Sequence, residues 1–481
     1  MNSIQQLNRR QFLKMTAAFG AGLSLSSAGC RAGIAGSKKT NAKYAKKPNI
    51  LFIPVDDLRV QLGCYGHTET LSPNIDRLAS EGTLFKRAYC QVPVCGPSRV
   101  SVMTGTRTRS NQWYTSALGR DLKSLPRVFK ENGYHAISNG KVYHTMDDDK
   151  ESWSEEPWRS TAVYYGKGDW AGYNKYGQWQ NPESAELVNK SSGRGPFCES
   201  ADVPDDAYQD GKVADKTISD LRKFKDMDKP FFIACGFWRP HLPFNAPKKY
   251  WDMYDADEIE LADNRYRPKN LPKQCRNSSE INRYGQVRGR KSTVDFHRQA
   301  RHGYYACVSY VDAQVGRVLD ELENLGLADN TIVILWGDHG WHLGEHDFWG
   351  KHNTLNNALQ APMIIRAPGY KKNNKTDALV EFVDMYPSLC ELAGISGPEK
   401  QLEGKSFVPL MSNPDLPWKK AVFSNYGGKA VKTDRYLYTE WKNSRMLFDH
   451  KVDPEENVNI AELPESAEIV KKLSALVNKT R

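Results

Sequence analysis

Short apolar runs recur along the chain, and each is followed by a cluster of polar residues. The runs have the length of buried β-strands, while apolar positions within residues 304–322 repeat at helical spacing. This alternation predicts an α/β fold with a large, mostly parallel sheet. The predicted strands are residues 50–55, 134–138, 231–237, 331–336 and 363–365.

Chemically active side chains stand where the predicted strands end. Asp56 and Asp57 follow the first strand, Lys141 follows the second, and Asp338 and His339 follow the fourth. Open α/β sheets bind their ligands at the carboxyl ends of the strands. We therefore expect these side chains to meet at one edge of the sheet.

The pattern changes after about residue 415, where strands become shorter and closely spaced turns join them. Ile469, Leu473 and Leu476 predict a closing helix. We expect a catalytic domain over residues 48–415 and a small antiparallel α+β subdomain over residues 416–481. The predicted C-terminal strands are residues 421–426, 431–432, 436–441 and 446–448.

Two long segments lack clear periodicity, which is typical of functional lids. Residues 150–210 are rich in Trp and Tyr. The sequence does not decide whether these side chains pack within the loop or stack on a sugar. Residues 264–291 carry nine Lys and Arg and one acid, Glu280. For this basic segment we favour a solvated surface over a ligand site.

The net charge of +10 is concentrated near the N-terminus. Residues 1–47 hold nine Lys and Arg and no acid, which leaves 58 basic and 57 acidic residues in the rest. A nearly neutral folded part argues against a nucleic-acid partner.

Residues 1–30 are typical of an export signal. Arg9 and Arg10 precede a mildly apolar run, as in twin-arginine leaders. Cys30 closes a lipobox-like stretch and would be lipidated, which would anchor the chain to a membrane; cleavage near Ala28 without lipidation is the alternative. Residues 31–47 form a flexible linker. We expect a location in the periplasm or on the outer cell surface, and no later stretch is long and apolar enough to span a membrane.

Nine cysteines occur, without the spacing of a metal-binding pair. Cys64, Cys235, Cys307 and Cys390 lie in apolar contexts typical of core thiols. Cys198 and Cys275 lie in polar contexts, and a disulfide between them remains open. Cys95 stands apart because of its neighbours.

The stretch Cys95-Gly96-Pro97-Ser98-Arg99 resembles the signature of the type I sulfatase family. The resemblance implies that a maturation enzyme oxidises Cys95 to formylglycine, whose hydrate attacks sulfur and later expels sulfate. Pro97 suits the first turn of a helix through residues 98–103. Cys95 would then lie at the positive end of that helix, where a sulfate is favoured.

The same resemblance implies a calcium site. Its ligands would be Asp56, Asp57, Asp338 and His339, together with the modified Cys95. Three carboxylates suit a hard cation, and the choice of Ca²⁺ comes from the family.

The resemblance also implies the catalytic groups. Lys141 and Lys351 would bind the sulfate oxygens. His144 would take a proton from residue 95, and His241 would protonate the leaving alcohol or bind sulfate. Arg99 would hold the formylglycine hydroxyl.

Within the family the chain resembles the iduronate-2-sulfatase-like group. This implies an alkaline-phosphatase-like sandwich and a sulfated, uronic-acid-containing polysaccharide or oligosaccharide as substrate. Arg239, beside His241, is our candidate for a substrate anion, and Trp238 and His342 are candidate pocket residues. The resemblance rests on residues 56–59, 62–66, 72–76, 94–105, 140–144, 338–346, 447–450 and 453–457.

Two other functions remain open. A phosphohydrolase or phosphonate hydrolase would share the fold, although cysteine at position 95 argues against it. A non-catalytic protein that binds sulfated glycans would result if Cys95 were never oxidised.

Overall fold

The central sheet has seven strands in the order β11-β2-β10-β7-β1-β5-β3. The computed structural model describes residues 46–114, 121–144, 149–160, 178–181, 183–184, 187 and 194–479. β10 pairs antiparallel with both of its neighbours, and the other pairings are parallel. The strands are β1 (Asn49–Val55), β2 (Thr83–Tyr89), β3 (His135–Gly140), β5 (Phe231–Gly236), β7 (Thr331–Gly337), β10 (Met363–Arg366) and β11 (Asn374–Glu381).

The middle of the sheet is buried on both faces, which explains the uninterrupted apolar runs. In β1, Ile50 and Phe52 point into one hydrophobic cluster, while Leu51, Ile53 and Val55 point into the other. A strand covered on both sides gains from apolar residues at every position. The five predicted strands are confirmed for this reason.

β2 and β11 were not predicted. β2 carries Lys86 and Arg87 at its less buried positions, and β11 carries Lys375 and Asp377 at exposed ones. These charges interrupt the apolar pattern, so only pairing in the sheet identifies both segments as strands. The antiparallel direction of β10 also depends on pairing and has no local signal.

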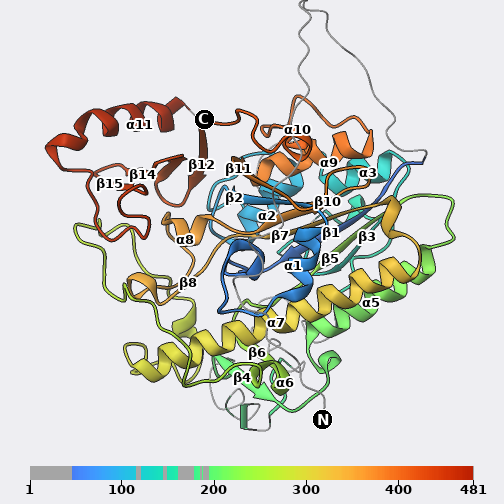
Figure 1. Cartoon of the computed structure of the whole chain (residues 1–481), viewed down its shortest axis with the longest axis horizontal. Coiled ribbons are helices and arrows are strands. Elements are labelled where there is room, and N and C mark those ends of the chain that lie inside the picture. Colours follow the sequence, from blue (N-terminus) through green and yellow to red (C-terminus); the bar gives the residue numbers. More distant parts are fainter. Residues whose placement is uncertain are drawn as a thin grey trace, which may run out of the picture. The chain divides into compact units, whose positions relative to one another are not determined.

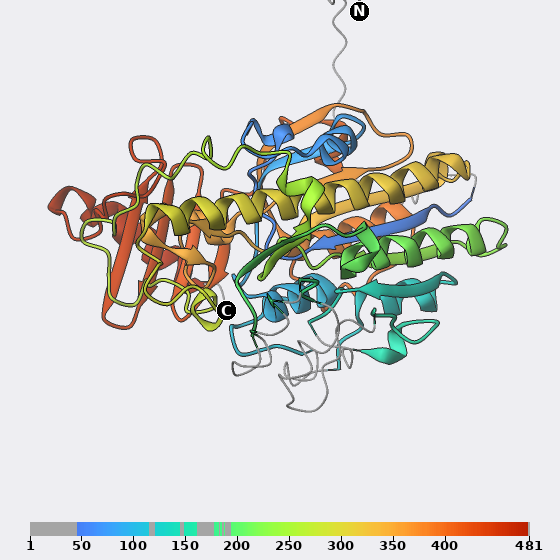
Figure 2. The same ribbon diagram turned by 90° about the horizontal axis from the view of Figure 1, so that it is seen from below.

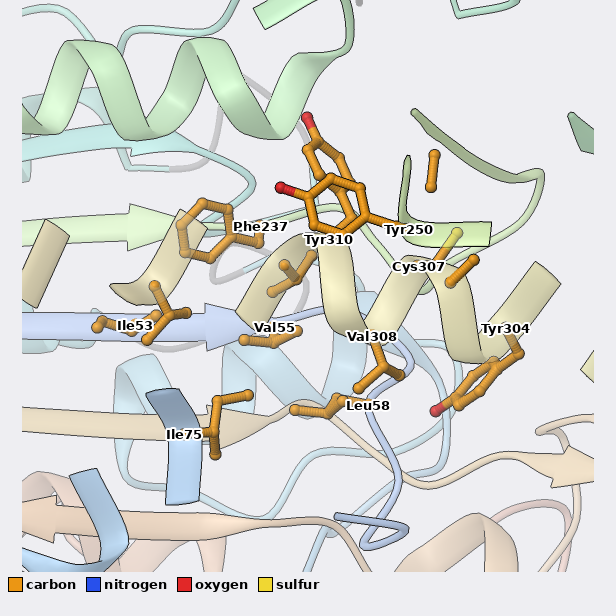
Figure 3. Packing of buried hydrophobic residues seen from close by; sticks show 14 of the residues in the cluster. Ile53, Val55, Leu58, Ile75, Phe237, Tyr250, Tyr304, Cys307, Val308 and Tyr310 are labelled. Carbon is orange, nitrogen blue, oxygen red and sulfur yellow. The ribbon is translucent and has the colours of Figure 1, made fainter. Parts of the chain in front are cut away.

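Helices cover both faces of the sheet (Figure 1). On one face α5 and α7 lie side by side, as Figure 2 shows, and α1 packs against α7. Figure 3 shows Ile53 and Val55 of β1 in one cluster with Val308 and Tyr310 of α7. The long α7 contains the predicted periodic stretch. These helices are α1 (Pro73–Ser80), α5 (Gln209–Phe224) and α7 (Val294–Asn324).

The opposite face is covered by helices that contribute to the second cluster. They are α2 (Cys95–Thr104), α3 (Leu125–Glu131), α9 (Met385–Ala393) and α10 (Val408–Ser412). Smaller elements are α6 (Lys248–Trp251), α8 (Asn356–Leu359), and the paired strands β4 (Cys198–Ala201) with β6 (Phe244–Pro247) and β8 (His342–Leu343) with β9 (Trp349–Gly350).

A second, antiparallel sheet near the C-terminus confirms the predicted small subdomain architecture. Its strands follow in chain order, and α11 (Ala467–Lys479) packs Val470, Leu473 and Val477 against it. The boundary after residue 415 stays a prediction. The strands are β12 (Ala421–Asn425), β13 (Lys429–Thr433), β14 (Tyr436–Trp441) and β15 (Ser444–Asp449).

The remaining predictions have mixed outcomes. Cys198 and Cys275 are both free and buried, and they lie in different hydrophobic clusters, so they do not pair. Trp153 and Trp179 pack into the protein interior. The export signal, Cys30 and the aromatic residues between positions 161 and 177 lie outside the described residues. None of the described helices combines the length and hydrophobicity needed to cross a bilayer.

Candidate active site

The site lies where four neighbouring strands end. β7, β1, β5 and β3 are adjacent and parallel, so the residues after each strand converge on one edge of the sheet. Asp56 and Asp57 follow β1, Asp338 and His339 follow β7, and Lys141 follows β3. The loop after β5 adds His241. The structure therefore brings these side chains together at one edge of the sheet, as the sequence predicts.

Cys95 begins α2 and lies inside this cluster. Its side chain is buried, and its Sγ is 3.3 Å from His339 Nε2 and 3.3 Å from Lys351 Nζ. Asp57 Oδ1 lies 3.9 Å from the same sulfur. The helix starts two residues before Pro97, so residue 95 stands at the positive end of the α2 dipole, which favours an anion.

The acids and His339 form a set that suits a cation. Ligand atoms of Asp56, Asp57, Cys95 and His339 all lie within 4.8 Å of one another. His339 Nδ1 lies 3.0 Å from Gly340 O and donates a hydrogen bond to it. The lone pair of Nε2 therefore faces the cluster. Within the described residues, Asp56 Oδ1 and Asp57 Oδ2 are buried without a hydrogen-bond partner.

Asp338 differs from the other predicted ligands because neighbouring groups already engage its carboxylate. Its Oδ1 accepts from Asp57 N at 3.0 Å, and its Oδ2 accepts from Arg99 Nε at 2.9 Å. Oδ1 also lies 3.6 Å from His339 Nε2, so the carboxylate borders the same space.

The two adjacent carboxylates differ in acidity. Burial favours the neutral form of Asp56, but the Lys141, His241 and Arg99 charges outweigh it and hold the pKa of Asp56 well below its usual range. Burial raises the pKa of Asp57 to about 7, because Lys351 offsets only part of the desolvation. A bound cation would favour the ionised form of both, so the donor set fits a metal ion.

Three cationic side chains line the cluster. Lys141 pairs with Asp56, Lys351 pairs with Asp57 at 2.6 Å, and Arg99 pairs with Asp338. All three are buried. Arg99 also donates to the carbonyl oxygens of Lys141 and Val142, which fixes the turn that presents Lys141.

His144 reaches the site beside an aromatic residue that was not predicted. The rings of His144 and Trp113 lie 4.9 Å apart. Burial, together with the Lys141 charge, holds the pKa of His144 well below its usual range, so the ring is neutral near pH 7. Trp113 also packs on Gly96, where a Cβ would lie 2.2 Å from its Cε3 atom.

His241 lies in a loop that contains two cis X-Pro bonds, after Arg239 and after Leu242. Its Nδ1 lies 2.7 Å from Leu242 O, and its Nε2 lies 3.1 Å from Glu280 Oε1. Glu280 Oε2 is 3.2 Å from Lys351 Nζ. Glu280 was not predicted as a site residue; its only sequence signal is that it is the single acid in a basic segment.

The predicted substrate residues lie in different places. Trp238 is next to the cluster, with Lys141 Nζ 4.7 Å from its ring centroid. Arg239 is buried and donates to the carbonyl oxygens of Asn245 and His241, so its contacts are those of a residue that fixes the loop. His342 is buried against Phe348 and bonds with Asn353, and its described contacts do not include the cluster.

A layer of contacts behind the candidate metal ligands was also not predicted. Asp57 has a φ of 58°, an uncommon backbone conformation for a residue other than glycine. Tyr304 of α7 donates to Asp57 O at 2.8 Å and accepts from Arg59 N at 3.0 Å. Arg59 in turn pairs with Glu345 at 2.8 Å. These contacts hold the turn after β1, and the helical spacing of Tyr304 had placed it only in the core.

Comparisons with protein families agree along nearly the whole described chain. The family model described as Sulfatase matches residues 48–395. A second one, described as N-sulphoglucosamine sulphohydrolase, C-terminal, matches residues 344–481.

Individual proteins are similar as well. Iduronate 2-sulfatase of Homo sapiens is 34% identical over 406 residues, which cover 73% of this chain and 70% of that protein. A protein named Sulfatase from Formosa agariphila is 32% identical over 470 residues, which cover 92% and 89%.

Two solved structures share the fold. A protein in complex with its substrate D-glucosamine-2-N,6-O-disulfate has a TM-score of 0.69 at 21% identity, covering 90% of this chain and 97% of that one. The phosphonate monoester hydrolase of Agrobacterium radiobacter has a TM-score of 0.72 at 22% identity, covering 90% and 95%. These likenesses confirm the predicted alkaline-phosphatase-like α/β fold.

Proposed function

The chain belongs to the sulfatase family of sulfuric ester hydrolases, and on this premise we propose that it removes sulfate from a saccharide through Cys95 after oxidation to formylglycine. The observation that carries the proposal is the buried cluster around residue 95. There the sulfur, an acidic set suited to a cation and three cationic side chains lie together at the carboxyl edge of the sheet.

The state of the unmodified thiol supports the oxidation step. Burial, together with the Asp56 charge, raises the pKa of Cys95 well above its usual value. A protonated thiol is a poor nucleophile. The hydrate of a formylglycine at this position would supply a hydroxyl that attacks sulfur. A formylglycine-generating enzyme is therefore the proposed maturation partner.

Asp56, Asp57, Asp338 and His339, together with residue 95, would hold one divalent cation, which we assign to Ca²⁺. Carboxylate oxygens suit this hard ion, and the two buried oxygens without hydrogen bonds in the described part of the chain could ligate it. When bound, the ion would supply positive charge against the sulfate oxygens.

The remaining side chains take roles that follow from their charge. Lys141 and Lys351 would bind sulfate oxygens, and Arg99 would orient residue 95. His144, neutral because of its lowered pKa, would accept a proton from residue 95. His241 would donate a proton to the leaving alcohol.

Sulfated saccharides that contain uronic acids are the proposed substrate class. Support comes from the similarity to iduronate 2-sulfatase over 73% of the chain. Trp238 stays a candidate sugar contact because it borders Lys141. Arg239 and His342 have less support, since their described contacts are used within the protein.

We also propose export to the periplasm or outer surface, because Arg9 and Arg10 precede the mildly apolar run over residues 15–28. Changing both arginines to lysine should leave the chain in the cytoplasm when cell fractions are immunoblotted. A lipid-modified N-terminal peptide would support anchoring through Cys30, and an unmodified peptide cleaved near Ala28 would contradict it.

The function is tested with protein matured in a host that makes formylglycine. Sulfate release is measured from defined sulfated saccharides and nitrophenyl sulfate, with nitrophenyl phosphate in parallel and Cys95→Ala as the control. We expect sulfate release only by the wild type, and an aldehyde at residue 95 by mass spectrometry. Faster phosphate turnover would favour a phosphohydrolase, and an unmodified thiol without turnover would favour a binding protein.

A further inference from the structure

Glu280 projects from a basic surface segment into the candidate active site. Residues 264–291 carry nine Lys and Arg, of which seven are exposed, whereas the side chain of Glu280 is only 15% exposed. Glu280 N donates to Ser278 Oγ at 3.2 Å, and that hydroxyl is 2.7 Å from His352 Nδ1. Ile281, which follows, is fully buried. The backbone is therefore anchored on both sides, and the carboxylate is held inward.

The carboxylate of Glu280 contacts two of the candidate catalytic side chains. Its Oε1 lies 3.1 Å from His241 Nε2, and its Oε2 lies 3.2 Å from Lys351 Nζ. One carboxylate thus bridges an imidazole and an ammonium that come from distant parts of the chain. Although burial disfavours the charge, Lys351 and His241 hold the pKa of Glu280 well below its usual range. The group is ionised and accepts hydrogen bonds only.

The contacts of His241 determine where its protons lie. Leu242 O can only accept, so Nδ1 carries a proton at 2.7 Å from it. The ionised Glu280 also only accepts, so the contact at Nε2 is satisfied only if this nitrogen carries a proton as well. Burial and the charge of Lys351 lower the pKa of His241, whereas Glu280 favours its protonated form. The contact geometry therefore makes Glu280 the group that favours a proton on Nε2.

We propose that Glu280 is a positioning residue of the reaction, which orients His241 and Lys351 and keeps a proton on Nε2 of His241. This inference rests on the proposed sulfatase function. As the bond between sulfur and the sugar oxygen breaks, its electron pair stays on the sugar oxygen. That oxygen takes the Nε2 proton, which Glu280 had shared, and leaves as an alcohol while the ring becomes neutral.

The choice of substrate distinguishes this role of Glu280 from that of a purely structural ion pair. A sugar alkoxide is a poor leaving group and needs the proton, whereas a nitrophenolate leaves without one. General acid catalysis contributes about 10²–10⁴-fold where it is needed. Loss of Glu280 should therefore slow saccharide sulfates more than aryl sulfates, whereas a general loss of structure would slow both equally.

The test compares Glu280→Gln with Glu260→Gln, which makes the same change at an exposed acid. Both variants are matured as the wild type is, and their melting temperatures are recorded. For each protein kcat is measured on nitrophenyl sulfate and on a saccharide sulfate that the wild type cleaves. We expect Glu280→Gln to lower the ratio of saccharide to aryl kcat by about tenfold or more. Glu260→Gln should leave the ratio unchanged.

A second arm asks whether Glu280 acts through His241. In a His241→Gln background, Glu280→Gln should not lower the ratio further, because the proton donor is already absent. Glu280→Asp, which keeps the charge on a shorter side chain, should recover part of the ratio. It also provides a second variant if Glu280→Gln fails to fold.

Equal losses on both substrates, or a further fall of the ratio in the His241→Gln background, would overturn the positioning role. If the wild type releases sulfate from no ester, the proposed function itself fails, and the role of Glu280 fails with it. A wild type that cleaves both substrates with an unchanged ratio in Glu280→Gln overturns only the role of Glu280.

Discussion

At the scale of single residues, the site is a set of opposed buried charges whose acidic side chains suit a cation. Lys141 pairs with Asp56, Lys351 with Asp57 and Glu280, and Arg99 with Asp338 and Asp56. Even so, one oxygen of Asp56 and one of Asp57 remain buried without hydrogen bonds in the described part of the chain, and burial raises the pKa of Asp57 to about 7. Unpaired buried carboxylate oxygens cost free energy unless an ion or a proton binds them.

Chelation should therefore destabilise the protein. We expect the melting temperature to fall in EDTA and to recover with Ca²⁺, because an ion that binds only the folded state stabilises it. At a free concentration about 100 times Kd the gain is about 2.7 kcal/mol. Differential scanning fluorimetry with Ca²⁺, Mg²⁺ and Mn²⁺ in parallel would measure this and identify the preferred ion.

The matched variant is Asp57→Asn, which keeps the shape of the side chain but removes its charge. Its melting temperature should respond less to Ca²⁺ than that of the wild type. A wild type that ignores both EDTA and Ca²⁺ would contradict the metal site.

At the scale of elements, helix α2 presents residue 95, and its second residue must be small. Gly96 lies against the indole of Trp113, which also packs beside His144. A side chain at position 96 would displace Trp113, since the added carbon would lie 2.2 Å from Cε3. The start of α2 and the loop after it are therefore fitted to each other.

Gly96→Ala should lower the free energy of unfolding by about 1 kcal/mol or more, because overpacking forces the indole to move. Urea denaturation would measure the loss. In a Trp113→Ala background the same substitution should cost less, since the obstructing ring is gone. Equal costs in both backgrounds would show that Gly96 and Trp113 are not coupled.

At the scale of the whole molecule, a buried ion cluster joins the central sheet to the start of the C-terminal sheet. Glu381, the last residue of β11, pairs with Arg107 at 2.7 Å and with Lys419 at 2.6 Å. Lys419 also pairs with Asp384 at 2.7 Å. Glu381 further accepts from the backbone of Phe423 in β12 at 3.3 Å. Lys419 therefore neutralises two buried acids at this junction.

Lys419→Met should lower the free energy of unfolding by about 3 kcal/mol, because the buried Asp384 loses the cation that pairs with it and Glu381 keeps only Arg107. The neighbouring Lys420 is exposed, so Lys420→Met should change stability by less than about 0.5 kcal/mol. Unfolding in urea, followed by Trp fluorescence, compares the two. Similar small losses in both variants would mean that Arg107 and the backbone suffice at this junction.

The difference between local patterns and contacts between distant segments explains which features could be predicted. β1, β5 and β7 were predictable because a strand buried on both faces needs an apolar residue at every position. The polar residues directly after them were predictable as neighbours because parallel strands end at the same edge of the sheet. β2 and β11 were not predicted because exposed charges break their apolar pattern. Arg239 was predicted as a substrate residue, and its hydrogen bonds to loop carbonyl oxygens have no local sequence pattern that identifies them.

By itself, the pattern of the sequence determined the α/β architecture, the small C-terminal sheet and the meeting of residues 56, 57, 338 and 339 at one edge of the sheet. The place of Cys95 beside them was implied by the resemblance to sulfatases. The apolar pattern of a strand and the residues at its end are local features, so each can be recognised in a single segment of the sequence. Only the tertiary structure decided the direction of β10, the close packing of Trp113 on Gly96 and the entry of Glu280 into the site. Each of these depends on contacts between segments far apart in the chain, and such contacts exist only once the whole fold has brought the segments together.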